Sequence, residues 1–393
     1  MSHLPFDQVK LSDLNLDAFG RLRVSQPSVL FHHTSEYTIA DKYNETTAGS
    51  GTITHDEDES AFYLNVGTAS GDKATREAKK FAQYVPGQSH LIEMTGILQP
   101  PKSGVKTKIG ARSGGDGVWF ESDGSDTKIV ISSTTSGSPV EFSIPYSQWE
   151  LTDYFGHAVS LDFSKAMIFG VDLQWLGVGR VRFFIGRAGK PLVVYDKDHS
   201  GQLGRVYMQT ARLKCFYEIE NTATTASSTS MAQICSTVVT EGMSGLSAVN
   251  NTISTGLTAI TVSTGAWQPI LAIRMKEVTT GGKLIRALWK MADIQVLPSA
   301  KKDFYFRISC ATINGGTWTD VSATHSFLEY QVSPSVTSIE HNAYGFFANA
   351  GNVLNVQGLS ALRFAPGEEL LIDARVLGAT DDIFVVVNAE EEF

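Results

Sequence analysis

Cysteine is scarce in this chain, and none of it is spaced as in a disulfide framework or a zinc site. The three cysteines, Cys215, Cys235 and Cys310, are odd in number and form no C-x-x-C pair, so neither a disulfide framework nor a cysteine-based zinc site is expected. We therefore interpret them as reduced, buried side chains. The nine histidines show no H-E-x-x-H pair, so no metal site is predicted.

Charge and long apolar runs are also in short supply. Charged residues make up 19% of the chain and the formal net charge is -9, which argues against nucleic-acid binding because phosphates require a basic face. No run of about 18 apolar residues predicts a membrane span. The N-terminal MSHLPFDQVK lacks the charged-then-apolar order of a signal peptide, so we expect a protein made soluble in the cytoplasm.

Motifs for nucleotide binding and nucleophilic catalysis are missing too. The string GVGRVR at 177–182 lacks the third glycine of a dinucleotide-binding turn and continues as a strand instead of a helix. No G-x-S-x-G elbow is present. The composition allows a pair of carboxylates suited to glycoside hydrolysis, but no motif points to such a pair. The sequence therefore predicts no catalytic residue, no cofactor and no enzymatic activity.

What the chain does contain is a succession of short strands. Residues 166–195, AMIFGVDLQWLGVGRVRFFIGRAGKPLVVY, alternate apolar and polar residues and are punctuated by glycine turns. A period of two is the pattern of strands with one buried face. In the second of these strands Arg180 and Arg182 alternate with apolar neighbours. Arginines are therefore predicted to line one face of a hairpin.

The same pattern divides the chain into parts. The predicted class is all-β, with two β-sandwich or jelly-roll-like domains and an extended N-terminal arm. Residues 75–85 are favoured as a strand over a helix, and the acidic end Glu390–Glu392 is expected to be solvated. The predicted parts are an arm over 1–30, a jelly-roll or lectin-like β-sandwich over 31–241, a Gly/Ser/Thr-rich linker over 242–266 and a second β-sandwich over 267–393.

Tryptophan is the residue that could bind a sugar on such a fold, because exposed rings on a β-sandwich face act as platforms. Trp175 lies on the apolar side of its strand and is predicted to be core. Trp119, within the glycine-rich GGDGVWFESDG, is the better candidate for an exposed glycan platform. Core or subunit interface is the favoured alternative for Trp119.

Three stretches resemble a family of tailed-bacteriophage virion structural proteins over most of residues 17–241. They are DAFGRLRVSQPSVLFHH, TASGDKATREAKKFAQYVPGQSHLIEMTGIL and VDLQWLGVGRVRFFI with the following VYMQTARLKCFYEIEN. WQPILAIR and FRISCATINGGTWTDVSATHSFLEYQVS are similar to β-rich terminal domains of such proteins. The resemblance implies many copies in a particle, contacts with other virion structural proteins, and no turnover.

The predicted function is therefore a non-enzymatic structural component of a tailed-phage virion. We expect it to fold in the host bacterial cytoplasm and to be tail-associated, as a homo-oligomeric, trimeric fibre, collar or baseplate protein. A capsid decoration protein and a glycan-binding receptor module, whose partner is a host surface glycan, are the alternatives. The predicted intersubunit residues are Asp17, Phe19, Arg21, Arg23, Arg180 and Arg182, with intramolecular charge pairs as the alternative for the last two.

Overall fold

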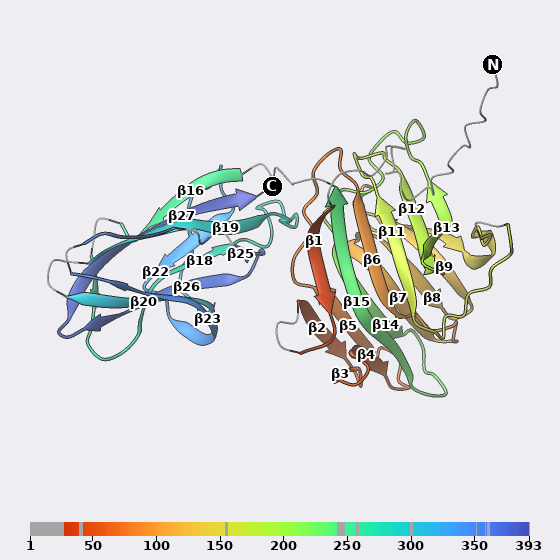
Figure 1. The fold of residues 1–393 in the computed structure, drawn as a ribbon, viewed down its shortest axis with the longest axis horizontal. Helices are drawn as coiled ribbons and strands as arrows, with labels where there is room; N and C mark the ends of the chain where they lie inside the picture. Colours follow the sequence, from red (N-terminus) through yellow and green to blue (C-terminus); the bar gives the residue numbers. More distant parts are fainter. Residues whose placement is uncertain are drawn as a thin grey trace, which may run out of the picture. The chain divides into compact units, whose positions relative to one another are not determined.

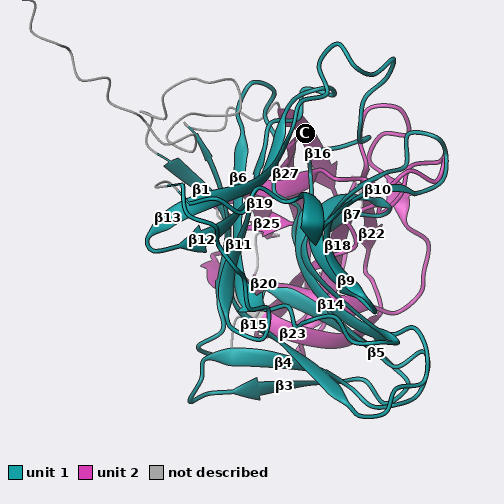
Figure 2. Cartoon of the chain, turned by 90° about the vertical axis from the view of Figure 1, so that its right-hand side faces the viewer, with its two compact units in different colours: residues 1–245 teal, residues 246–393 magenta. Residues whose placement is uncertain are grey.

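The computed structural model describes residues 27–38, 42–153, 156–241, 248–256, 259–298, 302–350, 352–357, 359 and 362–392. The chain divides into two compact units, residues 1–245 (unit 1) and 246–393 (unit 2), coloured separately in Figure 2. Over the described ranges the elements are β-strands and short turns, without an α-helix, so the predicted all-β class is confirmed. No helix in these ranges is long and apolar enough to cross a membrane.

Unit 1 is a sandwich of two antiparallel sheets. Sheet 1 has the order β13-β12-β11-β6-β15-β4-β3, and β1 pairs with β15; Figure 1 shows β1, β15, β6, β11 and β12 side by side. Its strands are β1 (Pro27–Thr34), β3 (Thr52–Asp56), β4 (Ala61–Val66), β6 (His90–Ile97), β11 (Met167–Leu173), β12 (Val181–Arg187), β13 (Lys190–Lys197) and β15 (Thr229–Glu241).

Sheet 2 covers the inner face of sheet 1 and has the order β10-β9-β8-β7-β14-β5-β2. A short 3-10 turn, η2 (Tyr146–Gln148), follows its edge strand. The strands are β2 (Tyr43–Ala48), β5 (Lys73–Ala78), β7 (Val105–Ser113), β8 (Asp116–Asp123), β9 (Asp126–Ser133), β10 (Val140–Pro145) and β14 (Lys214–Asn221). The segment weighed between helix and strand thus begins inside β5.

Alternation along each strand decides which side chains form the core of unit 1. Val171 on β11 and Phe183 on β12 lie directly opposite each other and are buried between the sheets. Phe120 on β8 of sheet 2 meets the Phe183 ring edge-on, with centroids 5.5 Å apart. Trp175 packs half-buried against the same core. The period-two pattern of the sequence therefore assigns the inner face of these strands correctly.

Unit 2 is a second pair of antiparallel sheets. Sheet 3 has the order β16-β27-β19-β24, with β17 on β27 and β25 on β19; sheet 4 has the order β21-β22-β18-β26-β20-β23. The strands of sheet 3 are β16 (Ala248–Ser254), β17 (Ile260–Val262), β19 (Leu288–Pro298), β24 (Leu354–Gln357), β25 (Arg363–Phe364) and β27 (Asp381–Glu392). Those of sheet 4 are β18 (Gln268–Met275), β20 (Asp303–Ile313), β21 (Thr319–Asp320), β22 (Leu328–Val332), β23 (Val336–Ala348) and β26 (Glu369–Leu377).

Much of the segment predicted as a linker is instead part of unit 2. Strands β16 and β17 both pair with β27, and Ile253 and Val262 are buried in the core between sheets 3 and 4. The physical reason is that a few apolar residues in a Thr- and Ser-rich segment are enough to fill one face of an edge strand. Residues 242–247 lie outside the described residues.

The acidic end of the chain is likewise not a solvated tail. Glu390 to Glu392 belong to β27, and Glu391 and Glu392 are buried. Lys290 on β19 forms ion pairs with Glu390 at 2.9 Å and with Glu392 at 3.2 Å. Cross-strand partners that are remote in sequence therefore hold these carboxylates in the sheet.

Candidate functional site

The two strand arginines predicted at an interface pair with carboxylates of their own chain. Arg180 donates from Nε to Asp196 Oδ1 at 2.7 Å, and Arg182, which is 1% exposed, donates from Nε to Asp172 Oδ2 at 3.1 Å. These are the intramolecular charge pairs that the sequence left open. A contact of either arginine with a neighbouring subunit stays a prediction.

The other predicted interface residues, Asp17, Phe19, Arg21 and Arg23, lie outside the described residues. The same holds for most of the predicted arm. Their role between subunits therefore also stays a prediction. The described part of residues 1–30 begins with Pro27 at the start of β1, which pairs with β15.

The exposed ring predicted at Trp119 is not found, because only 5% of Trp119 is exposed. It faces the outer side of sheet 2, where it lies between Val130 and Phe216 in one small cluster. Gly110 lies directly opposite Trp119 on β7 and leaves room for the ring. The Lys108 ammonium covers it, 5.2 Å from the ring centroid. A sugar could not stack on Trp119 without displacing this lysine.

Around Trp119 the outer face of sheet 2 is a ladder of alternating charges. Lys128, Glu121, Lys108 and Glu218 lie opposite one another in a row across β9, β8, β7 and β14. Neighbouring Lys–Glu pairs include Lys128–Glu121 at 3.1 Å and Lys108–Glu218 at 3.4 Å. These pairs neutralise the carboxylates within the sheet, as cross-strand ion pairs do. This row of ion pairs is therefore better explained as a stabilising feature of sheet 2 than as a ligand-binding site.

Glu218 is the most strongly perturbed carboxylate in this ladder. Burial alone would raise its pKa, but the cations of Arg112, Lys108 and Lys73 outweigh burial and lower the pKa to about 2. Arg112 donates from Nη1 to Glu218 at 2.9 Å. Glu218 is therefore an ionised, fully paired anion at neutral pH. A general acid for glycoside hydrolysis needs the opposite, a raised pKa.

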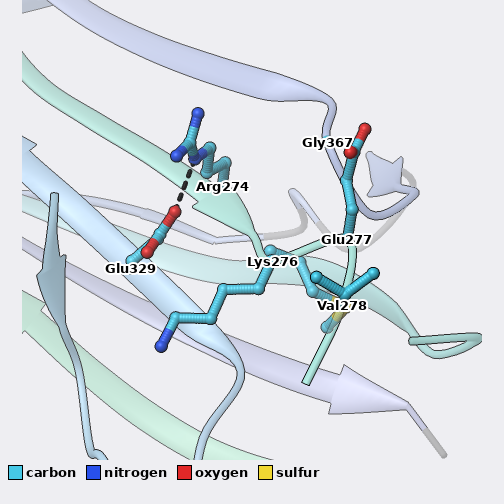
Figure 3. A pocket seen from close by; sticks show the side chains of 7 residues that line it. Arg274, Lys276, Glu277, Val278, Glu329 and Gly367 are labelled. Atoms are coloured by element: carbon cyan, nitrogen blue, oxygen red, sulfur yellow. Dashed lines mark hydrogen bonds and ion pairs between the residues drawn. The ribbon is translucent and has the colours of Figure 1, made fainter. Parts of the chain in front are cut away.

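A second surface with paired charges lies in unit 2, on the face of sheet 4 that points away from its core. A cavity of about 440 Å³ opens at one end of this face. In Figure 3 Arg274 and Glu329 face each other at one side of it, and Glu277 extends towards the loop that holds Gly367. Lys276 also lines it and forms an ion pair with Asp320 at 2.5 Å.

Arg274 is the centre of a three-part arrangement at this cavity. It donates from Nε to Glu329 Oε1 at 2.6 Å and from Nη1 to Glu369 Oε1 at 2.9 Å. Its guanidinium carbon lies 4.1 Å from the centroid of the Trp318 ring. Two charge-assisted hydrogen bonds and one cation–π contact hold this arginine in a fixed position.

The same arrangement recurs further along the same face. Arg307 on β20 pairs with Asp373 on β26, with Nε to Oδ1 at 2.9 Å, and its guanidinium carbon lies 3.9 Å from the Trp267 ring centroid. On β26 the paired residues Glu369 and Asp373 are four positions apart, or about 13 Å along a strand. Two tryptophan–arginine–carboxylate sets therefore stand on one sheet surface.

Further aromatic rings continue this surface beyond Arg307. The Tyr305 ring lies 5.1 Å from that of Trp267 and stacks on that of Phe347 at 4.6 Å, with 23° between the planes. Phe347 is 61% exposed. Gly345 permits this packing, since a Cβ there would meet the Tyr305 hydroxyl at 2.4 Å. An apolar ring face is thus offered to solvent next to a fixed arginine.

We call this surface the arginine–tryptophan face. It consists of Trp267, Arg274, Tyr305, Arg307, Trp318, Glu329, Phe347, Glu369 and Asp373. Its rings can contact the C–H face of a planar or puckered ring. Its arginine side chains, 31% exposed at Arg274 and 17% exposed at Arg307, can donate hydrogen bonds to hydroxyl groups. Over the described ranges no group of three or more His, Cys, Asp or Glu side chains could hold a metal ion.

Sequence reasoning missed this face, although part of its signal was present. In β20, Tyr305 and Arg307 alternate with the core residues Phe304 and Phe306, so their outward direction follows from period two. The association of Trp267 with Arg307 joins positions forty residues apart and depends on the pairing of β18, β26 and β20. That pairing is not readable from local pattern.

Comparisons with known proteins find only distant structural similarity. No family model and no curated protein matches the chain. A putative β-glucanase from Mycobacterium abscessus is similar at 11% identity and a TM-score of 0.39, over 54% of this chain and 100% of that one. A Bacillus licheniformis β-glucanase gives 12% and 0.36, over 56% and 100%. The CBM2 module of the evolved Dit of Lactobacillus casei BL23 phage J-1 gives 9% and 0.36, over 56% and 99%.

The prediction of a chain without enzymatic activity is contradicted by this set. Several of the similar structures are named as glycoside hydrolases, glucanases or transglycosylases. Fold alone is therefore no ground for denying activity to this chain. At TM-scores below 0.4 and identities of 9–14%, the same neighbours assign no reaction and no ligand to it.

Proposed function

We propose that this chain binds carbohydrate through the arginine–tryptophan face of unit 2. The observation that carries the proposal is the repeated tryptophan–arginine–carboxylate set, with Arg274 under Trp318 and Arg307 under Trp267. Sugars present C–H faces that pack on aromatic rings and hydroxyl edges that take charged hydrogen-bond partners. Both kinds of partner stand here side by side on a rigid sheet.

The spacing of the two sets favours an extended polysaccharide over a single sugar. About 13 Å separates the two carboxylate positions on β26, and Leu371 lies between them on the same face of the strand. A short oligosaccharide would reach one set, whereas a longer one would engage both. Affinity is therefore expected to rise steeply with chain length until both sets are occupied.

The test begins with a glycan microarray that includes bacterial surface polysaccharides, followed by calorimetric titration of oligosaccharides of increasing length from the polysaccharide that binds. Trp267→Ala, Trp318→Ala and Phe347→Ala are each expected to weaken binding of the long oligosaccharide about tenfold, equivalent to ~1.4 kcal/mol. The reaction mixtures are analysed for new reducing ends, so that turnover is measured with binding.

Tyr37→Ala is the matched control, because Tyr37 is an exposed aromatic residue of unit 1, at 70%. It is expected to bind like the unchanged chain. Thermal unfolding of every variant shows whether the fold is kept. Binding that survives all three substitutions on the face, or a chain that binds none of the arrayed glycans, would overturn the proposal.

We infer a location for this activity from the resemblance of residues 17–241 to tailed-phage virion structural proteins. The chain would be carried on the particle as a homo-oligomer, a trimer in a tail fibre, collar or baseplate, or alternatively as a decoration of the capsid. Its partners would be copies of itself, other virion proteins and the host surface glycan. Electron microscopy of the particle tests this, since density of this chain in tail, head or neither decides between the alternatives.

A further inference from the structure

A second cavity, in unit 1, lies at the open rim of the sandwich, between the edge strand β10 and the loop that follows β13. Its volume is about 370 Å³. Among the described residues β10 pairs only with β9, so no further strand of the described part of unit 1 covers this edge. We call it the rim cavity. It belongs to a different unit from the arginine–tryptophan face.

One wall of the rim cavity is apolar and open to solvent. Phe142 lies directly opposite Ile131 in the β9–β10 pair and faces the same side of sheet 2. Ile131 is core, whereas Phe142 is 53% exposed and Val140 is 58% exposed. Leu203 and Val206 from the facing loop are exposed at 45% and 38%. Exposed apolar side chains gathered around a cavity are typical of a binding site.

A stacked pair of aromatic rings forms another wall of the rim cavity. The His199 ring is stacked on the Tyr207 ring, with centroids 4.1 Å apart and 5° between the planes. His199 Nδ1 is 2.9 Å from the carbonyl oxygen of Gly179, which fixes the ring in place. The Tyr207 hydroxyl is buried without a hydrogen-bond partner among the described residues. The wall is thus preformed and includes an unused polar group.

Among the residues that the structure describes, the charged side chains lining the rim cavity are both cations. They are Lys197 and Arg205, and no acidic residue of the described ranges lines the cavity. Lys197 donates from Nζ to Gln202 Oε1 at 3.0 Å, and Arg205 Nη1 lies 3.4 Å from the Thr135 carbonyl oxygen. Within the described ranges neither forms an ion pair with a carboxylate. The nearby Asp198 instead accepts the backbone N–H of Ser200 at 3.0 Å.

We propose that the rim cavity binds a small carboxylate with an apolar body, in the manner of a medium-chain fatty acid. The apolar body packs on Val140, Phe142 and Leu203. The carboxylate is held by Lys197 and Arg205. Neither element of the site would suffice alone, because a neutral apolar molecule leaves both cations unpaired and a bare anion leaves the apolar wall in water.

The experiment titrates the full chain with decanoate by calorimetry, below the concentration at which decanoate aggregates. Decanol tests the apolar body without the charge, and acetate tests the charge without the body. We expect saturable binding of one decanoate per chain, and binding of decanol and acetate that is weaker by at least about tenfold. Absence of saturable decanoate binding, or decanol binding as tightly as decanoate, overturns the proposal.

Two pairs of variants locate the site. Phe142→Ser and Arg205→Gln change exposed side chains, and each is expected to weaken decanoate binding about tenfold. Tyr37→Ser and Arg187→Gln are the matched controls: Tyr37 is an exposed aromatic residue of the same unit, and Arg187 makes the same kind of 3.4 Å contact, with the Ser160 carbonyl oxygen. Equal losses in the controls, or no loss in the rim-cavity variants, would show that decanoate binds elsewhere.

Discussion

Glu391 on β27 lies directly opposite Trp289 on β19, and neither side chain is exposed to solvent. The carboxylate accepts the backbone N–H of Phe327 at 2.7 Å and the Asn251 side-chain N–H at 3.0 Å. Burial nevertheless raises its pKa above the ordinary value of 4.5, against these hydrogen bonds. A carboxyl group therefore ends the apolar stripe of β27 inside unit 2.

The raised pKa predicts how stability changes with pH. Because the folded state holds the Glu391 proton more tightly than the unfolded state, the contribution of this group to the free energy of unfolding is full below pH 4.5. It is lost as the pH rises through the folded pKa. Glu391→Gln removes this loss, so its stability relative to the unchanged chain should improve between pH 4 and pH 7. Urea unfolding at the two pH values measures it.

Glu390→Gln is the control for this prediction. Glu390 is the preceding residue on β27, lies on the opposite face of the strand and pairs with Lys290. Its substitution should not produce the same gain between the two pH values. A gain for Glu390→Gln equal to that for Glu391→Gln would show that the effect belongs to overall charge and not to burial.

Glu218 in unit 1 is expected to make stability depend on pH in the opposite direction. Its folded pKa of about 2 lies below the ordinary 4.5, so its stabilisation is present above pH 4.5 and is lost as the pH falls towards 2. Glu218→Gln should lower the free energy of unfolding at pH 7 by about 3 kcal/mol, the value of a shift of that size. At pH 2 the substitution should cost much less.

Glu220→Gln on the same strand is the matched comparison. Glu220 is 36% exposed and pairs with Lys73 at 3.2 Å, and exposed ion pairs contribute less than about 1 kcal/mol. Chemical unfolding of both variants at pH 7 should therefore separate them clearly. If the two substitutions cost the same, the ladder on sheet 2 would contribute through general charge balance and not through the buried Glu218.

The contrast between the inner and outer faces of the strands shows how far sequence reasoning reaches. Period two correctly places Val171 and Phe183 in the core, because burial on one face leaves a local pattern. It cannot say what covers the other face. Trp119 is buried by Lys108 from the neighbouring strand and by Phe216 from β14, and those contacts depend on strand order.

The same limit explains the missed site. In each half of the arginine–tryptophan face, the alternation of apolar and polar residues correctly predicts that some side chains point outward. Arg307, between the core residues Phe306 and Ile308, is an example. The tryptophans that cover the arginines come from segments just outside strands β18 and β21, so no periodicity marks them. Only the order β21-β22-β18-β26-β20-β23 brings the two sets to one surface.

Gly110 is predicted to be essential for the burial of Trp119. A Cβ at this position would lie 2.4 Å from Trp119 Cβ and 2.3 Å from the Val118 carbonyl oxygen. Both distances are shorter than van der Waals contact, and the backbone of β8 would have to move to relieve them. Gly110→Ala should therefore destabilise unit 1 by roughly 1–3 kcal/mol, as overpacking does. Gly204→Ala, where a Cβ meets nothing within 4 Å, should leave the thermal midpoint nearly unchanged. Equal midpoints for both variants would contradict the packing described here.

The last prediction concerns where unit 2 begins. A fragment of residues 246–393 retains β16 and β17, whereas one of residues 267–393 lacks Ile253, Ile260 and Val262, all buried in the core of unit 2. Burying an aliphatic side chain contributes about 1.5–3 kcal/mol, so the shorter fragment should be less stable by on the order of 5 kcal/mol. Circular dichroism during urea unfolding compares them. Equal stability of the two fragments would mean that β16 and β17 pair with β27 without contributing to the stability of the core of unit 2.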